Sequence, residues 1–337
     1  MAMTSRERIA AAIHFTGPDR LPTSADRFGV SAKLNHAGHH KDGVETYAGS
    51  QGIDDFGCVW QRTEVRNMGY VTTHPLADLS RLPDYVWPDP DDPKKYEGLA
   101  EQVDQAGDRY AIVGLGITLW ERLWMLHGMD QTLVELVTDP APLAELADRI
   151  VDYDVRVIRN MGQACPGRIH GVQLTDDWGT QQATFVSPAL WRRFFQPRYR
   201  RIFHAAHEQG WDVWIHSDGR INEIIDGWIE AGLDVINLPA PLMVGIDEIG
   251  QRFRGRICFS GGVDNQMTLP QGDPQAIRAQ AKLLLERWGT PEGGFIGPDY
   301  DWIEGRDGSF LEQYGLTRQA VVTMIEAFRE FDPYKAD

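Results

Sequence analysis

The sequence predicts an α/β protein with the (β/α)8 TIM barrel fold, a single domain over residues 1–337 with an extra helix at its N-terminus. Short apolar runs alternate with longer segments of helical periodicity along almost the whole chain. This alternation implies parallel strands joined by right-handed crossovers. The runs number eight, which fits a closed barrel better than an open sheet. No GxGxxG or GxxxxGKS/T pattern follows any run, which disfavours a dinucleotide-binding or P-loop protein.

The predicted strands are short apolar runs that end in glycine or polar residues. They cover residues 20–26, 56–60, 110–116, 169–175, 211–216, 233–238, 256–262 and 293–298. Helical periodicity fills residues 131–162, 187–210, 221–232 and 274–289. The opening segment has the sequence of a capped helix, since Thr4 or Ser5 stands just before Glu7 and a periodic apolar face follows.

Composition limits the partners and the compartment. The net charge of −16 argues against nucleic acid and against an anionic membrane surface. No apolar run is long enough to span a bilayer, and none at the start resembles a signal peptide. The three cysteines are far apart and form no CxxC pair, so we expect a cytoplasmic protein without disulfides. The oligomeric state stays open, with a homodimer as one option.

Polar residues gather where the predicted strands end. They are Asp26 and Arg27 after the first strand, Glu121 and Arg122 beyond the third, Asp176, Asp177 and Trp178 after the fourth, His216 and Asp218 after the fifth, Asp264 after the seventh, and Asp299 and Asp301 after the eighth. Active sites of TIM barrels lie at the C-terminal ends of the strands. We therefore expect one cavity at the barrel mouth to be lined by Asp26, Arg27, Asp177, His216, Asp218 and Asp264.

Each candidate also has a purely structural interpretation. His216 and Asp218 indicate a substrate or metal site, but Asp218 is equally explained as the cap of a helix beginning near Ile221. The adjacent Asp176 and Asp177 repel each other, which raises a carboxyl pKa towards the range useful for proton transfer, unless the loop is simply solvated. Asp264 follows two glycines, so a tight turn explains it as well as a substrate contact does.

Several stretches together resemble the uroporphyrinogen decarboxylase-like superfamily, which includes the decarboxylase and corrinoid:thiol methyltransferases. They are SRERIAAAIHFTGPDRLPT, DDFGCVW, GLGITLWERL, DDWGTQQATFVSPALWRRFFQPRYRRI, HSDGRINEIIDGWIEAGLDVINL and FSGGVDNQMTLPQGDP. The resemblance covers nearly the whole chain and implies a (β/α)8 barrel with its site at the strand C-terminal ends. It also implies that Arg27 matches one arginine of the loop that binds the porphyrinogen carboxylates.

The chain departs from both branches of that superfamily. Ser31 stands about where a second clamp arginine is expected, and Asp177 replaces the serine of an FDSW motif. The thiol-methylating branch carries zinc on His-x-Cys and a later Cys, whereas this chain keeps His216 and has Asp218 at the first of those cysteines. We therefore expect no tightly bound cofactor. Zinc is a less favoured option, with His216 and Asp218 as ligands and Asp301, Asp299 or Glu121 as the third.

The function favoured by the sequence is methyl transfer from a small methylated or methoxylated substrate to a corrinoid protein or folate. Asp177, His216 and Glu121 are the expected catalytic residues. The expected substrate-binding residues are Asp26, Arg27, Asp176, Trp178, Asp218, Asp264 and Asp301. The alternatives are a cofactor-independent decarboxylase of a porphyrinogen-like or smaller carboxylic acid, in which Arg27 holds a carboxylate, and a non-catalytic binding barrel that kept the pocket.

Overall fold

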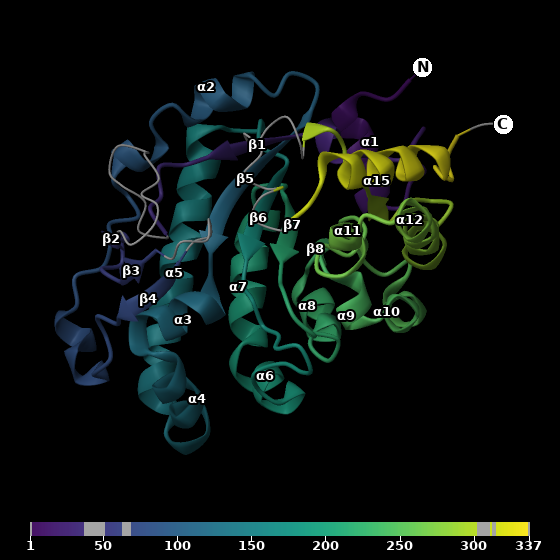
Figure 1. The fold of residues 1–337 in the computed structure, drawn as a ribbon. Helices are drawn as coiled ribbons and strands as arrows, with labels where there is room; N and C mark the ends of the chain where they lie inside the picture. The colour runs from purple at the N-terminus through teal and green to yellow at the C-terminus, as the bar shows by residue number, and fades with distance from the viewer. Residues whose placement is uncertain (1, 37–50, 63–68, 302–310, 312–314, 336–337) are drawn as a thin grey trace.

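The centre of the molecule is a curled parallel sheet of seven strands, and helices pack around it (Figure 1). The computed structural model describes residues 2–36, 51–62, 69–301, 311 and 315–335. In spatial order the strands are β1 (Arg27–Ser31), β5 (Tyr110–Ile117), β6 (Gly171–Thr175), β7 (Asp212–His216), β8 (Val235–Asn237), β9 (Cys258–Ser260) and β10 (Phe295–Ile296). This arrangement agrees with an α/β fold of the TIM type.

A single backbone bridge joins the two edges of the sheet. Thr23 pairs in parallel with Gly297, just after β10. Ser24 N donates to Gly297 O at 2.9 Å, and Gly297 N donates to Pro22 O at 2.9 Å. The predicted strand 20–26 therefore contains a pairing residue, but a 3-10 turn over Ser24–Asp26 interrupts it, and regular pairing begins only at Arg27.

The predicted strand 56–60 does not belong to the parallel sheet. Its end forms β3 (Val59–Gln61), which pairs antiparallel with β2 (Gln51–Ile53) and β4 (Tyr70–Thr73) in a separate sheet. Adjacent parallel strands need a crossover of a dozen or more residues, usually a helix, whereas hairpin loops are short. The spacing within 51–73 therefore suits antiparallel pairing.

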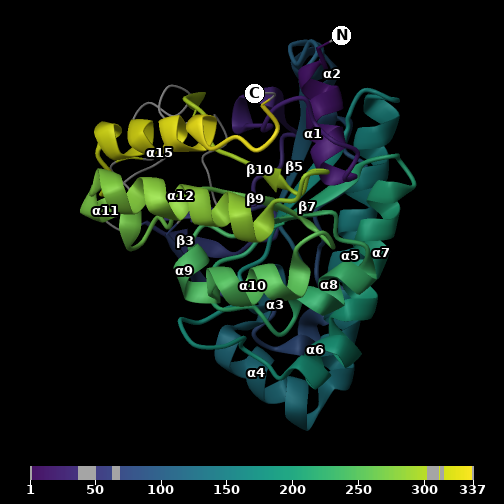
Figure 2. The same ribbon diagram turned by 90° about the vertical axis from the view of Figure 1, so that its right-hand side faces the viewer.

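Helices lie between the parallel strands and after the last of them. They are α2 (Leu99–Asp104), α3 (Leu119–His127), α4 (Met129–Thr138), α5 (Pro140–Ala164), α6 (Pro188–Phe194), α7 (Gln196–His207), α8 (Ile225–Ala231), α9 (Pro241–Val244), α10 (Ile246–Phe253), α11 (Thr268–Gln271), α12 (Pro274–Trp288) and α15 (Arg318–Glu330). The last of these, α15, lies along α12 (Figure 2). Among the described residues, no helix has the length and apolar character needed to cross a membrane.

Helix α1 (Ser5–Ile13) covers the end of the sheet where the strands begin. Thr4 is its N-cap and forms a reciprocal capping box with Glu7. Its buried face, which includes Ile9 and Ile13, forms one apolar cluster with Tyr110 and Trp214 of β5 and β7. The C-terminal ends of the strands lie at the opposite end, towards α4 and α6 (Figure 1).

A buried ion pair fixes α3, the helix that follows β5. Arg122 Nη1 lies 2.6 Å from Asp54 Oδ2, and the two side chains are 1% and 0% exposed. Asp54 also accepts the backbone N–H groups of Phe56 and Cys58 and the indole N–H of Trp60. The pair therefore holds the segment 54–60 against α3.

Substitution of Asp54 by alanine would leave the Arg122 guanidinium buried without its counter-ion. We expect the free energy of unfolding to fall by about 3 to 5 kcal/mol, the usual cost of removing one partner of a buried pair. Urea unfolding measures the change. Glu145→Ala is the control, because it breaks an exposed pair with Arg149 that is worth about 0.5 kcal/mol or less. Equal changes in the two variants would contradict the structural role of Asp54.

An ion pair at the end of the sheet where the strands begin makes the stability of the protein depend on pH. His14 Nε2 lies 3.2 Å from Asp212 Oδ1, and this interaction raises the pKa of His14. A raised folded-state pKa contributes stability that is fully present below the unfolded value of about 6.5 and is lost as pH rises through the folded-state pKa. We therefore expect His14→Ala to destabilise the protein more at pH 6 than at pH 9, measured by urea unfolding at both pH values. An equal effect at both would contradict the assignment.

Candidate active site

Two loops beyond the ends of β6 and β7 continue the pairing of those strands. Asp176 N donates to His216 O at 3.0 Å, Gly179 N donates to Asp218 O at 3.2 Å, and Arg220 N donates to Thr180 O at 2.8 Å. These bonds join residues 176–180 to residues 216–220 along their whole length. The two segments most prominent in the sequence, TDDWGT and HSDGR, are therefore a single structural unit.

The close approach of the loops depends on Gly179 and Gly219. A Cβ atom added to Gly179 would lie 2.5 Å from Arg220 N and 2.6 Å from Gly219 Cα, too close for any side chain. Gly219 also has φ +84°, a left-handed conformation that favours glycine. We call this close approach of the two loops at Gly179 and Gly219 the loop crossing. It brings Asp177 beside Asp218, and Asp218 N donates to Asp177 Oδ1 at 2.7 Å.

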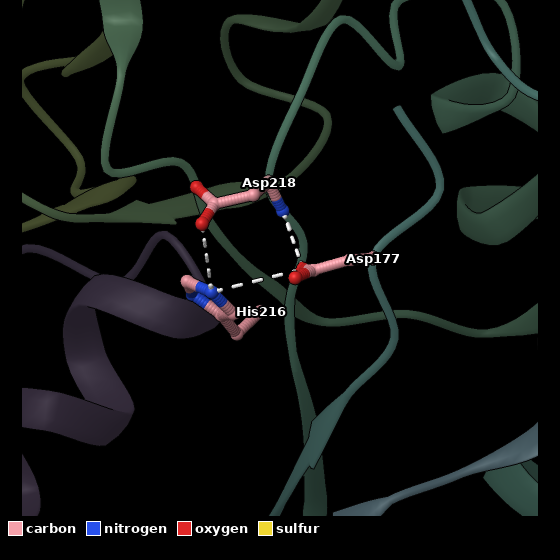
Figure 3. A group of neighbouring side chains, drawn as sticks. All are labelled: Asp177, His216 and Asp218. Carbon is pink, nitrogen blue, oxygen red and sulfur yellow. Dashed lines mark hydrogen bonds and ion pairs between the residues drawn. The ribbon is translucent and has the colours of Figure 1, made fainter. Parts of the chain in front are cut away.

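Asp177, His216 and Asp218 form a cluster around one ring nitrogen. His216 Nε2 lies 3.9 Å from Asp177 Oδ1 and 3.9 Å from Asp218 Oδ2, and both carboxylates point towards it (Figure 3). The His216 side chain is 27% exposed and each aspartate 41%, so the cluster is open to solvent. We call these three residues the DHD cluster.

Asn237, at the end of β8, fixes the tautomer of His216. The Asn237 Nδ2 group donates to Ser260 O at 2.6 Å, and a backbone carbonyl can only accept. The amide oxygen of Asn237 therefore faces His216 Nδ1, at 2.6 Å, and Nδ1 donates its proton to it. In neutral His216 the lone pair is then on Nε2, the nitrogen that faces the two carboxylates.

A buried carboxyl group lies next to the cluster. Glu121, in the first turn of α3, is 5% exposed, and among the described residues its Oε2 atom has no hydrogen-bond partner. Burial raises the pKa of Glu121 well above its ordinary value, and the charges of Asp177 and Asp176 raise it further. The surroundings of Glu121 therefore favour the protonated form of a carboxyl group that lies near Asp177.

Asp176 connects this acid to the strand end. Its carboxylate accepts Trp120 N at 2.9 Å and Glu121 N at 2.7 Å, the free amides at the start of α3, and the hydroxyl of Tyr199. Burial raises the pKa of Asp176 to about 7 against the opposing effect of these donors. Its side chain is fully buried, so Asp176 positions α3 and does not offer a free surface to substrate as the sequence had suggested.

Two further residues of these loops differ in environment from what the sequence suggests. Trp178 is fully buried, stacks on Trp120 at 4.7 Å and donates to Tyr199, so its side chain packs in the core and has no exposed surface. Asp218 does not cap a helix, because α8 begins only at Ile225 and has no side-chain cap. Instead its Oδ1 atom is buried without a partner, and burial raises the pKa of Asp218.

The prediction that Asp26 and Arg27 lie at the mouth is wrong. Asp26 is buried in ion pairs with Arg8 at 2.8 Å and Arg20 at 2.7 Å. Arg27 is the first residue of β1, pairs with the first residue of β5 and lies over the ring of Trp214. Because the segment before β1 turns through a 3-10 helix, both residues fall at the N-terminal end of the sheet.

The remaining acids of the strand ends are tied to other groups. Asp264 accepts the backbone N–H groups of Leu242, Gln266 and Met267, which is the tight-turn role. Asp299 accepts Thr23 Oγ1 and Arg329 Nη2, and borders a separate cavity of about 360 Å³. Asp301 accepts the Ser24 hydroxyl. Asp177 thus stands where Asp299, Asp301 or Glu121 was expected as a third metal ligand.

The family of the chain follows from a match over most of its length. The family model for uroporphyrinogen decarboxylase matches residues 59–297, which includes every residue of the DHD cluster. The chain belongs to the uroporphyrinogen decarboxylase family. Comparison with curated proteins gave no match.

Comparison with solved structures gave one similar fold and weaker similarities. A methyltransferase from Methanosarcina mazei has 15% identity and a TM-score of 0.68, with 98% of this chain and 99% of that chain covered. A xylanase 10B from Thermotoga maritima has 13% identity and a TM-score of 0.42, with 98% of each chain covered. A D-psicose 3-epimerase from Clostridium cellulolyticum H10 has 14% identity and a TM-score of 0.38, covering 75% of this chain and 84% of that chain.

A methyl group at Gly179 tests whether the loop crossing builds the site. We expect Gly179→Ala to lower the free energy of unfolding by about 1 to 3 kcal/mol, the usual cost of overpacking, and to change the NMR signals of the His216 ring. Gly29→Ala is the control, since Gly29 is exposed and an added Cβ there meets nothing within 4 Å. Unchanged His216 signals in Gly179→Ala would contradict the role of the crossing.

Proposed function

We propose that this member of the uroporphyrinogen decarboxylase family transfers a methyl group from a small methylated or methoxylated molecule to a corrinoid protein or folate. The observation that carries the proposal is the open DHD cluster together with the buried Glu121, whose pKa is raised by burial and by the charges of Asp177 and Asp176. A leaving oxygen or nitrogen needs a proton, and in this proposal Glu121 supplies it. The methyltransferase activity named for the Methanosarcina mazei neighbour supports the same reaction class.

The charge of the site favours a substrate without carboxylates. Asp177 and Asp218 are half-exposed on the same imidazole, and both would repel a substrate carboxylate that approaches His216. Arg27 was expected to hold such a carboxylate. It lies at the other end of the sheet, where its backbone is in register with that of Tyr110. A neutral ether or a methylated amine meets no such repulsion.

The reaction divides between the acceptor and this chain. The acceptor supplies the nucleophile that forms a new bond to the methyl carbon. The bond from that carbon to the heteroatom breaks, and its electron pair stays on the heteroatom. Glu121 donates its proton to that atom and regains one from solvent, while the DHD cluster orients the departing group. Asp177 assists because its carboxylate accepts the backbone N–H of Asp218 and so fixes the loop that follows His216.

Decarboxylation is the second candidate, because the matching family model is named for a decarboxylase. In that reaction Glu121 would protonate the carbanion formed as carbon dioxide leaves. The two candidates are separated by their products. We expect methylated corrinoid or folate from methoxylated aromatics or methylated amines, detected by mass spectrometry, and no carbon dioxide from aryl or pyrrole carboxylates. Carbon dioxide release without any methylated acceptor would overturn the proposal.

Replacement of Glu121 by glutamine removes the proton but keeps the size of the side chain. We expect turnover to fall by a factor of about 10² to 10⁴, as for loss of a general acid, with little change in the Michaelis constant. Glu145→Gln, on the exposed face of α5, is the matched control. Turnover equal to that of the control, with unchanged circular dichroism, would rule Glu121 out as the acid.

A further inference from the structure

We propose that the DHD cluster is an exchangeable site for a divalent first-row transition-metal ion, bound by Nε2 of His216 and one carboxylate oxygen each of Asp177 and Asp218. The proposal is independent of the reaction proposed above. It differs from the thiolate zinc set of the thiol-methylating branch in two of three donors. It also replaces the arrangement that the sequence favours, in which His216 meets substrate and Asp218 caps a helix.

The three donors have the spacing of an open ligand set. One ligand atom from each residue lies within 4.8 Å of the other two, which among the described residues makes this group a candidate for holding a metal ion. Adjacent ligands of a bound ion at about 2.1 Å are separated by about 3.0 to 3.4 Å in octahedral or tetrahedral geometry. His216 Nε2 is 3.9 Å from each carboxylate, so small side-chain rotations would complete the coordination.

The hydrogen bonds of His216 fix its ring in the orientation and tautomer that a metal ligand needs. Metal-bound histidines commonly donate their second ring N–H to a fixed acceptor, which sets the tautomer and the ring orientation. Here Asn237 Oδ1 accepts from Nδ1 at 2.6 Å, and Ser260 O fixes the Asn237 amide. The Nε2 lone pair therefore points into the cluster, in the direction a cation requires (Figure 3).

Among the described residues, two polar atoms in or near the cluster have no hydrogen-bond partner. Asp218 Oδ1 is buried and unpaired, and so is Oε2 of Glu121, a side chain that is 95% buried. Buried polar atoms are nearly always satisfied, so unpaired ones need an explanation. Two carboxylates that face a single imidazole also leave excess negative charge, which a divalent ion would neutralise.

The donor types indicate the class of ion. All three cysteines are buried and none belongs to the cluster, so the soft thiolates of a structural zinc site are absent from it. An imidazole excludes a pure oxygen cage of the calcium or magnesium type, and two carboxylates suit manganese or iron as well as zinc. With three protein ligands and half-exposed aspartates, open positions remain for water or substrate, and exchange is easy.

Metal binding can be measured without any turnover. The full-length protein is stripped with a chelator and titrated separately with Mn²⁺ and Zn²⁺ by calorimetry, and the shift in unfolding temperature is recorded. We expect one equivalent of either ion to bind and to raise that temperature. Asp177→Asn and His216→Ala should abolish binding, and the asparagine still accepts the hydrogen bond from Asp218 N.

Asn237→Ala tests the positioning role directly. We expect the affinity for metal to fall by a factor of about 10 to 100, the usual effect of removing a partner of a metal-bound histidine. His204→Ala is the matched control, because His204 pairs with Glu208 on the surface at 3.3 Å and should not affect binding. The proposal is overturned if neither ion binds, or if His216→Ala and His204→Ala bind alike. Methyl transfer without metal would leave the function standing and remove only this site.

Discussion

The candidate site depends on the contact between Gly179 and Gly219. Parallel strands normally diverge at their C-terminal ends, where the chain turns away towards the next helix. Here the β6 and β7 pairing continues for several residues beyond the strands, because neither glycine carries a side chain that would separate the loops. Asp177 and Asp218 therefore lie next to each other, and both carboxylates face Nε2 of His216, the residue that ends β7. Without this crossing the two aspartates would belong to separate loops.

Four carboxyl groups can lie close together at the site because their environments differ. Asp176 is buried but is surrounded by donors, including two amides at the start of α3. Among the described residues Oε2 of Glu121 has no such donor, and burial raises the pKa of this carboxyl group well above its ordinary value. Asp177 and Asp218 are half-exposed and are partly solvated. Neighbouring carboxyl groups therefore lie in different environments, and such differences separate acid and base roles in active sites.

Of the six residues that the sequence places in one cavity, the structure brings three together. His216 ends β7, Asp177 and Asp218 lie just beyond the ends of β6 and β7, and Glu121 lies in α3 after β5, because these strands form where the apolar runs predict them. The prediction fails for Asp26 and Arg27, because a 3-10 turn of three residues shifts the start of β1. The burial of Trp178 could not be predicted, since alternation of strand residues says nothing about the direction of a side chain in the loop that follows. Asn237 was missed, although it ends the next strand in register with His216.

The same reasoning explains how one barrel serves different chemistries. Cores of this kind are fixed by apolar side chains on the strands and helices, and α1 closes the end where the strands begin. The residues that meet substrate are on loops at the other end, where an exchange of side chain costs little stability. In this chain the exchange concerns carboxylates. Aspartates stand at 177, where the motif that the chain resembles has a serine, and at 218, where the thiol-methylating branch has a cysteine, so two half-exposed carboxylates flank His216. The chain shares the fold of its family but differs from it at residues 177 and 218. The charge of the loops is therefore the guide to the substrate.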